Sequence, residues 1–167
     1  MKKHIKRMAA PKSWAIPRKT SHWVTKPSPG PHRAERSMPL LSVVRDMLGL
    51  CDNSREARLI IGSRGITVDG RVVTDYKFPV GLMDVVTVLK TKQSYRMLVD
   101  YKARLKLIPV TDNEKGWKLA RIDGKKVVAG GKVQLNLHDG RCILLPKDQY
   151  KTGDVLKIEL PAQKVVK

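Results

Sequence analysis

Arginine side chains recur along the stretch SREARLIIGSRGITVDGRVV, Ser54–Val73. Arg55 and Arg58 are three residues apart, and Arg64 and Arg71 follow. Cations in such a cluster can neutralise the phosphates of a nucleic acid, which supply most of the affinity in such complexes. The alternative is that each is a solvated surface arginine that contributes little. We favour a face that contacts a nucleic-acid backbone.

Two helices are predicted to position these arginines. The first begins after Pro39, and its apolar residues recur at spacings of three and four: Leu40, Val44, Met47, Leu48 and Cys51. Asn53 is the expected N-cap of the second helix, with Glu56 as its partner in a capping box. The second helix places Arg55 and Arg58 opposite an apolar stripe formed by Ala57, Ile60 and Ile61.

A β-hairpin is predicted directly after the second helix. Gly62 and Gly65 are expected to end that helix, because a glycine adopts the left-handed conformation without steric cost. The pattern ITV-DG-RVV then predicts two strands joined by a two-residue turn at Asp69-Gly70. The segment 85–89 predicts a strand that closes the unit.

The net charge of the chain points to a polyanionic partner. Lys and Arg number 34 against 15 Asp and Glu, which gives a formal charge of +19. Such an excess raises the affinity for polyanions. Nucleic acid is the first interpretation, an anionic membrane surface the second and an acidic protein the third. No window approaches the roughly 18 consecutive apolar residues that a spanning helix needs, so we expect no membrane partner.

The first 45 residues are unusually basic and rich in proline. They contain 11 Lys or Arg, one acid, Glu35, and six of the ten prolines. Because proline blocks helix interiors and sheet ladders, we expect an extended arm that is disordered when free. Trp14 and Trp23 are uncommon in a solvating tail, and we expect them to pack or stack once the arm is bound to RNA.

Beyond Thr91 the sequence is typical of β structure. VQLNL and VLKIEL alternate apolar and polar residues, and the interior positions would be Val133, Leu135, Leu137, Leu156, Ile158 and Leu160. Turns are expected at Asp123-Gly124, Gly130-Gly131, Asp139-Gly140 and Gly153-Asp154. Strands at this spacing predict a small antiparallel barrel or sandwich.

A search for enzyme motifs finds none. The sequence has no G-x-S-x-G, H-E-x-x-H, Walker or dinucleotide-binding pattern. Turn geometry explains the aspartates beside glycines, and His138 is interpreted as a surface histidine at a turn. We therefore expect no catalytic residue, no metal, no cofactor and no small-molecule substrate.

The helix, helix, DG hairpin and closing strand resemble the αL-type RNA-binding module. Four further segments, KKHIKRMAAPKSW, KPSPGPHR, MPLLSVVRDML and KFPVGLMDVV, resemble in this order the archaeal and eukaryotic ribosomal protein S4e family. The resemblance runs from Lys2 to about Leu160. One family feature is the stretch 80–84, VGLMD, where other relatives of the module usually read Pro-Gly-Asp.

The resemblance implies an α+β protein with no catalytic turnover. Its expected parts are a basic extended arm (1–38), an αL-type RNA-binding domain (39–91), a β-rich central domain (92–162) and a tail (163–167). Family members continue into a KOW-like β-barrel, whereas this sequence stops at PAQKVVK, either as a truncated product or as a short member. Functions that rest on that barrel are not expected here.

The implied partners are 16S rRNA, in its 5′ domain, and neighbouring small-subunit ribosomal proteins in the cytoplasm. Two other functions stay open: an RNA-modifying enzyme or its targeting subunit, and a ribosome-associated factor. The expected RNA-binding residues are Lys2, Lys3, His4, Lys6, Arg7, Lys12, Trp14, Arg18, Lys19, Lys26, His32, Arg33, Arg45, Arg55, Arg58, Arg64 and Arg71.

Overall fold

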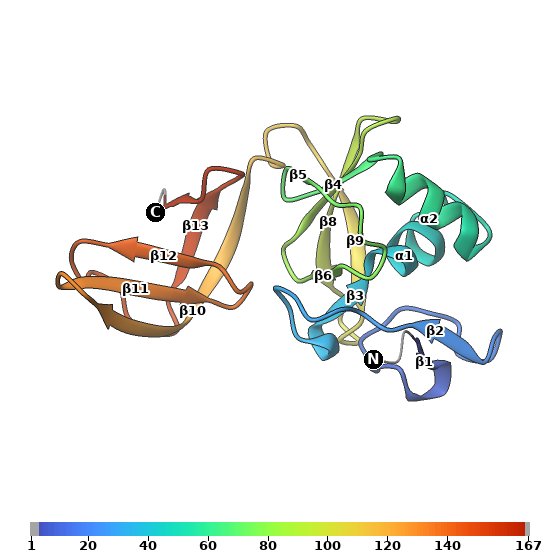
Figure 1. Cartoon of the computed structure of the whole chain (residues 1–167), viewed down its shortest axis with the longest axis horizontal. Helices are drawn as coiled ribbons and strands as arrows, with labels where there is room; N and C mark the ends of the chain where they lie inside the picture. Colours follow the sequence, from blue (N-terminus) through green and yellow to red (C-terminus); the bar gives the residue numbers. More distant parts are fainter. Residues whose placement is uncertain (1–3, 166–167) are drawn as a thin grey trace.

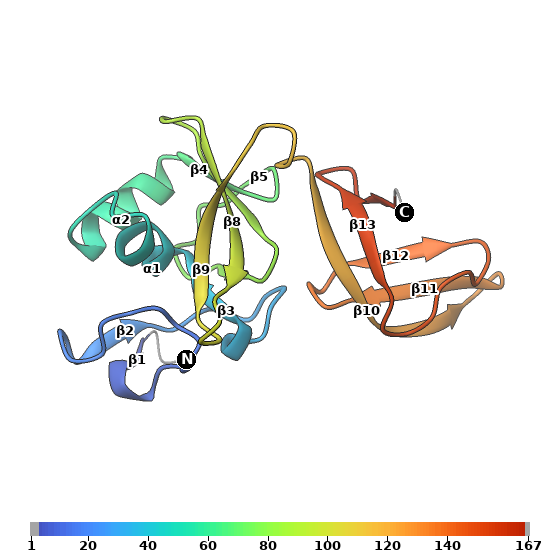
Figure 2. The same ribbon diagram turned by 180° about the vertical axis from the view of Figure 1, so that it is seen from behind.

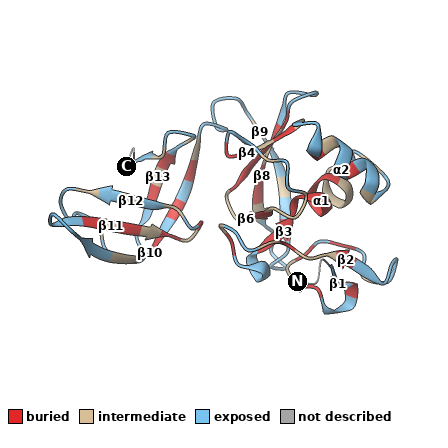
Figure 3. Ribbon diagram, viewed as in Figure 1, coloured by how far each residue is buried: buried red, intermediate tan, exposed pale blue. Residues whose placement is uncertain are grey.

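The computed structural model describes residues 4–165 of the 167-residue chain, which form two lobes (Figure 1). The larger lobe holds the N-terminal segment, both helices and a five-stranded sheet, and the smaller lobe is a second five-stranded sheet (Figure 2). Each lobe has its own core of buried apolar residues (Figure 3). Within residues 4–165, no helix is long and apolar enough to cross a membrane.

The N-terminal segment is packed against the larger lobe. Strand β1 (His4–Lys6) pairs antiparallel with β2 (Trp23–Thr25), and β3 (Ser37–Pro39) pairs with β6 (Pro79–Gly81). Trp14 is only 2% exposed and lies in the same core cluster as Ile16 and Val24. The expectation of an extended arm is therefore wrong for this structure, because single apolar residues anchor the segment without any helical or strand periodicity.

Guanidinium groups support this proline-rich segment from within. Arg7 Nη1 donates to the carbonyl of Pro17 at 2.6 Å and to Oγ1 of Thr20 at 2.7 Å. Arg18 donates to the carbonyls of Ala10 and Pro11 at 2.9 and 2.8 Å. Backbone carbonyls that are not paired in a sheet thus accept hydrogen bonds from arginine side chains.

The two helices pack against the sheet through their apolar faces. Helix α1 (Leu40–Ser42) continues into a π-helical segment, Val43–Met47, and α2 spans Ser54–Gly62. Asn53 is the N-cap, as predicted, and its Oδ1 accepts from the backbone N–H groups of Arg55 and Glu56. The Glu56 carboxylate accepts from the backbone N–H of Asp52 and from the Asn53 side chain, so the return bond is one residue earlier than a capping box requires.

Helix α2 ends at Gly62, as predicted, but not because a glycine is left-handed. Arg64, with φ at 60°, adopts the left-handed conformation, and neither Gly62 nor Gly65 does. Gly65 matters for a different reason, since a Cβ there would lie 3.2 Å from the carbonyl oxygen of Ile60.

One antiparallel sheet forms the centre of the larger lobe. Its order is β5-β4-β7-β8-β9, with the bounds β4 Ile66–Val68, β5 Arg71–Val72, β7 Val85–Val88, β8 Gln93–Val99 and β9 Leu105–Val110. Asp69 and Gly70 have φ values of 51° and 76°, which matches the predicted two-residue turn. The boundary predicted between residues 91 and 92 falls inside this sheet, because β8 pairs with β7 and β9 with β8.

The smaller lobe is a curled antiparallel sheet in the order β12-β11-β10-β13-β14. Its strands are β10 Trp117–Val128, β11 Lys132–Leu137, β12 Cys142–Leu145, β13 Val155–Glu159 and β14 Lys164–Val165. The first half of β10 pairs with β13 and its second half with β11, so this strand belongs to both sides of the curl. The turn predicted at Asp123-Gly124 is wrong: the register shifts there, and the pair forms a bulge inside β10.

Trp14 provides a test of whether the N-terminal segment is packed in solution. Replacing a buried tryptophan by alanine removes a large apolar surface and leaves a cavity, so Trp14→Ala should lower the free energy of unfolding by about 3–5 kcal/mol. Trp23, which is 50% exposed, is the matched control, and Trp23→Ala should cost far less. Urea denaturation measures both; equal midpoints for Trp14→Ala and the unmodified chain would mean that the segment is not part of the folded core.

Candidate nucleic-acid interface

The four arginines of the helix–hairpin unit are all exposed. Arg55 and Arg58 lie on α2, Arg64 follows the helix, and Arg71 begins β5. Among the described residues none of the four has a carboxylate within ion-pair distance. Arg58 is held with its guanidinium carbon 4.5 Å from the centre of the Tyr76 ring. This unit therefore presents cations whose charge the protein leaves unneutralised.

The N-terminal segment adds further cations at its surface. Its exposed predicted residues are His4, Lys6, Lys12, Lys19 and Arg33, and its half-buried ones are Arg18 and Lys26. Lys2 and Lys3 lie outside the described residues. Packing of the segment against the rest of the larger lobe thus turns most of its basic side chains outward.

Four predicted contact residues are instead buried or already paired: Arg7, Trp14, His32 and Arg45. Arg45 donates from Nε and Nη2 to the Asp46 carboxylate, both at 2.9 Å, and from Nη1 to Oγ of Ser54 at 2.8 Å. It therefore links the first helix to the start of α2. These four side chains hold the protein together, so the prediction that they contact RNA has no support in this geometry.

Of the two tryptophans in the N-terminal segment, Trp23 is the one that stays accessible. Its ring is half exposed and makes edge contacts with His4 and His22, at centroid distances of 4.5 and 4.6 Å. A small cavity lies between Trp23 on one side and two residues on the other: Arg45 of the π-helical segment and Ser54 at the start of α2. The β1–β2 ribbon and α2 therefore border one surface, on which Trp23 rather than Trp14 could stack on a base.

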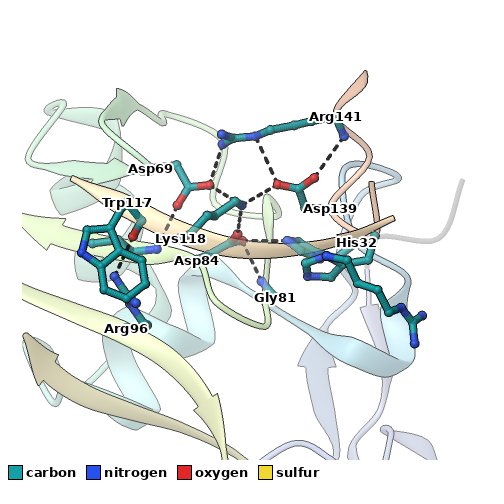
Figure 4. Close-up of polar contacts among 12 residues, drawn as sticks. His32, Asp69, Gly81, Asp84, Arg96, Trp117, Lys118, Asp139 and Arg141 are labelled. Atoms are coloured by element: carbon teal, nitrogen blue, oxygen red, sulfur yellow. Dashed lines mark hydrogen bonds and ion pairs between the residues drawn. The ribbon is translucent and has the colours of Figure 1, made fainter. Parts of the chain in front are cut away.

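A buried cluster of charges joins the two lobes (Figure 4). Lys118, on β10 of the smaller lobe, is 1% exposed, and its Nζ lies 2.7 Å from Asp69, 3.0 Å from Asp84 and 2.6 Å from Asp139. Asp69 and Asp84 belong to the larger lobe, and Asp139 to the turn after β11. One ammonium group thus bridges carboxylates from both lobes.

The carboxylates have further partners around this centre. Arg141 Nη2 lies 2.6 Å from Asp69, and Nε2 of His32 lies 2.9 Å from Asp84. Asp84 also accepts from the backbone N–H of Gly81 at 2.9 Å. His32 comes from the N-terminal segment, so the cluster connects three parts of the chain.

The pKa values of the cluster respond to burial and to neighbouring charge. Burial alone would lower the pKa of Lys118, but the charges of Asp84, Asp69 and Asp139 outweigh it and raise the pKa above its usual value. Burial, together with the Asp84 charge, raises the pKa of Asp69. Burial would raise the pKa of Asp84 too, yet its hydrogen bond with His32 and the Lys118 charge lower that pKa to about 2.

Sequence reasoning missed this cluster because each member has an ordinary local explanation. Asp69 and Asp139 stand in turns, and Lys118 is one of many basic residues. A signal was present in the two-residue period of β10, where Lys118 shares the buried face with Ala120 and Ile122. A lysine at an interior strand position requires a buried anion.

Removal of the Lys118 ammonium should strongly destabilise the protein. Lys118→Met keeps an unbranched side chain one atom shorter but leaves three buried carboxylates without their shared cation, and loss of such a partner costs about 3–5 kcal/mol. Lys126→Met, at an exposed position of the same strand, should change the free energy of unfolding by only about half a kcal/mol. Chemical denaturation of both variants decides: similar midpoints would contradict a stabilising role for the cluster.

Asp84 should make the protein sensitive to acid. A carboxyl whose pKa is lower in the folded than in the unfolded chain stabilises the fold above its unfolded pKa and loses that contribution as the pH falls. For Asp84 this loss of stability occurs between about pH 4 and about pH 2. The raised pKa of Asp69 has the opposite effect above pH 3.8, where its contribution to stability is lost as the pH rises. Unfolding free energies measured across this range should fall less steeply for Asp84→Asn than for the unmodified chain or for the control Asp148→Asn. Parallel slopes for all three would show that Asp84 does not carry the acid response.

Three family models match consecutive parts of the chain. The RS4NT (NUC023) domain matches residues 1–35, the S4 domain residues 38–86 and the Ribosomal family S4e residues 91–165. A solved structure, the 30S ribosomal protein S4e from Thermoplasma acidophilum, matches with a TM-score of 0.69 and 36% identity, over 79% of this chain and 68% of that chain. The expected mixture of helices and antiparallel sheets is therefore confirmed.

Curated relatives match along almost the whole chain. Small ribosomal subunit protein eS4 of Methanothermobacter thermautotrophicus is 48% identical over 99% of this chain, and that of Archaeoglobus fulgidus is 54% identical over 98%. This chain spans 68% of the length of each of these two relatives. With this identity and coverage, and with three models in register from the N-terminal segment to the smaller lobe, the chain belongs to the ribosomal protein S4e family.

Proposed function

We propose that this protein is a structural constituent of the small ribosomal subunit in the cytoplasm, where it binds 16S rRNA and contacts neighbouring ribosomal proteins. Its eS4 relatives are small-subunit proteins by name. We further propose that this contact lies in the 5′ domain of 16S rRNA, as expected from the family resemblance of the sequence. The protein acts by binding and carries out no catalytic turnover.

The observation that carries this proposal is the unneutralised charge of the helix–hairpin unit. Some other surface cations of the chain are paired with carboxylates, as Arg121 is with Asp123 and Lys125 with Asp148. Arg55 and Arg58, by contrast, share a helix whose one acid, Glu56, is already engaged at the N-terminus of that helix. Phosphate oxygens are the natural partners for guanidinium groups presented in this way.

Recognition by such a surface depends on the shape of the RNA more than on its sequence. The deep, narrow major groove of A-form RNA is inaccessible to side chains. Contacts to phosphates and to the 2′-hydroxyl groups in the shallow minor groove therefore dominate. The Tyr76 ring fixes Arg58 in place, which reduces the entropy lost when a phosphate binds. The outward lysines of the N-terminal segment extend the same kind of contact beyond the module.

Reversing the charge of α2 tests this function. Arg55→Glu/Arg58→Glu removes two attractions and adds two repulsions, so binding to 16S rRNA should weaken and the slope of log affinity against log salt should fall by about two. Stability should decline by only about 1 kcal/mol, through loss of the Arg58–Tyr76 contact. Filter binding at several salt concentrations, with a melting curve on the same protein, measures both effects.

The matched control is Lys126→Glu/Lys132→Glu, which makes the same change of charge at exposed positions of the smaller lobe. This control should lose less affinity than the α2 variant, although both have the same net charge. Equal losses would mean that only the overall charge attracts the RNA, and the assignment of α2 as a contact face would be wrong.

A further inference from the structure

The turn between β8 and β9 carries a highly exposed aromatic side chain. Tyr101 is 85% exposed, compared with 50% for Trp23. In both ribbon views this turn lies beside the N-terminal segment, at the end of the sheet away from α2 (Figures 1 and 2). An aromatic ring left so fully in water has an apolar face available to a partner.

The backbone of this turn is held rigidly. Asp100 and Arg104 close it through an N–H to carbonyl bond of 2.8 Å, and Ala103 donates its N–H to the carbonyl of Asp100 at 2.9 Å. The Asp100 carboxylate accepts the backbone N–H of Tyr101 at 2.8 Å. Leu105 N–H donates to the carbonyl of Ser13, which ties the hairpin to the N-terminal segment. The backbone at Tyr101 is thus held in place before any partner arrives.

A cationic cavity lies between this turn and the N-terminal segment. It has a volume of about 370 Å³, and its lining residues are Lys12, Trp14, Ile16, Arg18, Lys102 and Arg104. Four of these six are cations and none is acidic, and the described residues offer none of the four a carboxylate within ion-pair distance. The guanidinium of Arg18 is fixed by backbone carbonyls, which leave its charge intact.

Four like charges around one cavity repel one another, and an anion relieves that repulsion. The cavity is concave, so it suits a compact anionic group such as a phosphate better than it suits a flat surface. Lys102 Nζ lies 5.1 Å from the centre of the Tyr101 ring, so the aromatic face and the cations belong to one surface. A planar ring next to a cationic cavity matches the base and the phosphate of a nucleotide.

We propose that this surface is a second RNA contact, at which an unpaired nucleotide stacks its base on Tyr101 while an adjacent phosphate enters the cavity formed with Lys102 and Arg104. This proposal rests on the proposed function as an rRNA-binding protein. An unpaired nucleotide is required because a base inside a duplex has both faces covered. An acidic protein segment would use the cations but would gain little from the aromatic ring.

The test compares substitutions at Tyr101 in the full chain. Tyr101→Ala should weaken binding to 16S rRNA by roughly 5- to 150-fold, the range found when one base–aromatic stack is lost. Tyr101→Phe keeps the ring and should bind like the unmodified protein. Leu144→Ala, which removes an exposed apolar side chain from the smaller lobe, is the control and should have no effect.

A second measurement separates stacking from charge. Heparin is a polyanion without bases, so Tyr101→Ala should leave heparin retention unchanged, while Lys102→Ala/Arg104→Ala should lower both heparin retention and RNA affinity. The proposal is overturned if Tyr101→Ala binds RNA normally, or if Tyr101→Phe is as weak as Tyr101→Ala.

The outcome for α2 distinguishes this inference from the function on which it rests. If the Arg55/Arg58 variant loses rRNA affinity while Tyr101→Ala does not, the proposed function stands and the second contact is wrong. If the unmodified chain shows no affinity for 16S rRNA, both proposals fail.

Discussion

The ammonium group of Lys118 is the centre on which the arrangement of the chain depends. It lies within 3.0 Å of three buried carboxylates, from Asp69, Asp84 and Asp139, which would repel one another without it. The larger lobe supplies two of the carboxylates, and the smaller lobe supplies the ammonium group and the third. Since buried charges are costly without partners, the lobes are stable in contact only in an arrangement that keeps this lysine in place.

Some basic residues stabilise the fold and still keep their positive charge available to a partner, because they donate to backbone carbonyls and not to carboxylates. Arg7, Arg18 and Arg96 donate to backbone carbonyls, for example from Arg96 to Glu114 and Trp117 at 2.6 and 2.7 Å. A carbonyl accepts the hydrogen bond but carries no net charge, so the guanidinium stabilises a loop and still contributes its full positive charge to the surrounding field. The chain thereby supports segments that lack regular structure without reducing the attraction for a polyanion.

Local signals in the sequence were sufficient for the helix–hairpin unit. The Asn53 cap and the Asp69-Gly70 turn depend on residues a few positions apart, and the exposure of Arg55 and Arg58 follows from the helical period. The burial of Trp14 and the charge cluster could not be predicted in this way. The Lys118–Asp69 pair joins residues 49 positions apart, and nothing near either residue specifies the other. That the exposed arginines contact RNA stays a prediction.

The part of the chain that matches the S4 domain and the sheet of the larger lobe have different limits. The S4 domain match ends at residue 86, inside β7, whereas β7 lies between β4 and β8 with its valines buried. A fragment cut there would expose an apolar edge strand, which readily pairs with other chains and aggregates. Strand β9 is better suited to be the outer edge, because it carries Lys106 and Pro109, residue types that discourage such pairing. The sheet of the larger lobe therefore ends at Val110, well beyond the end of the S4 domain match.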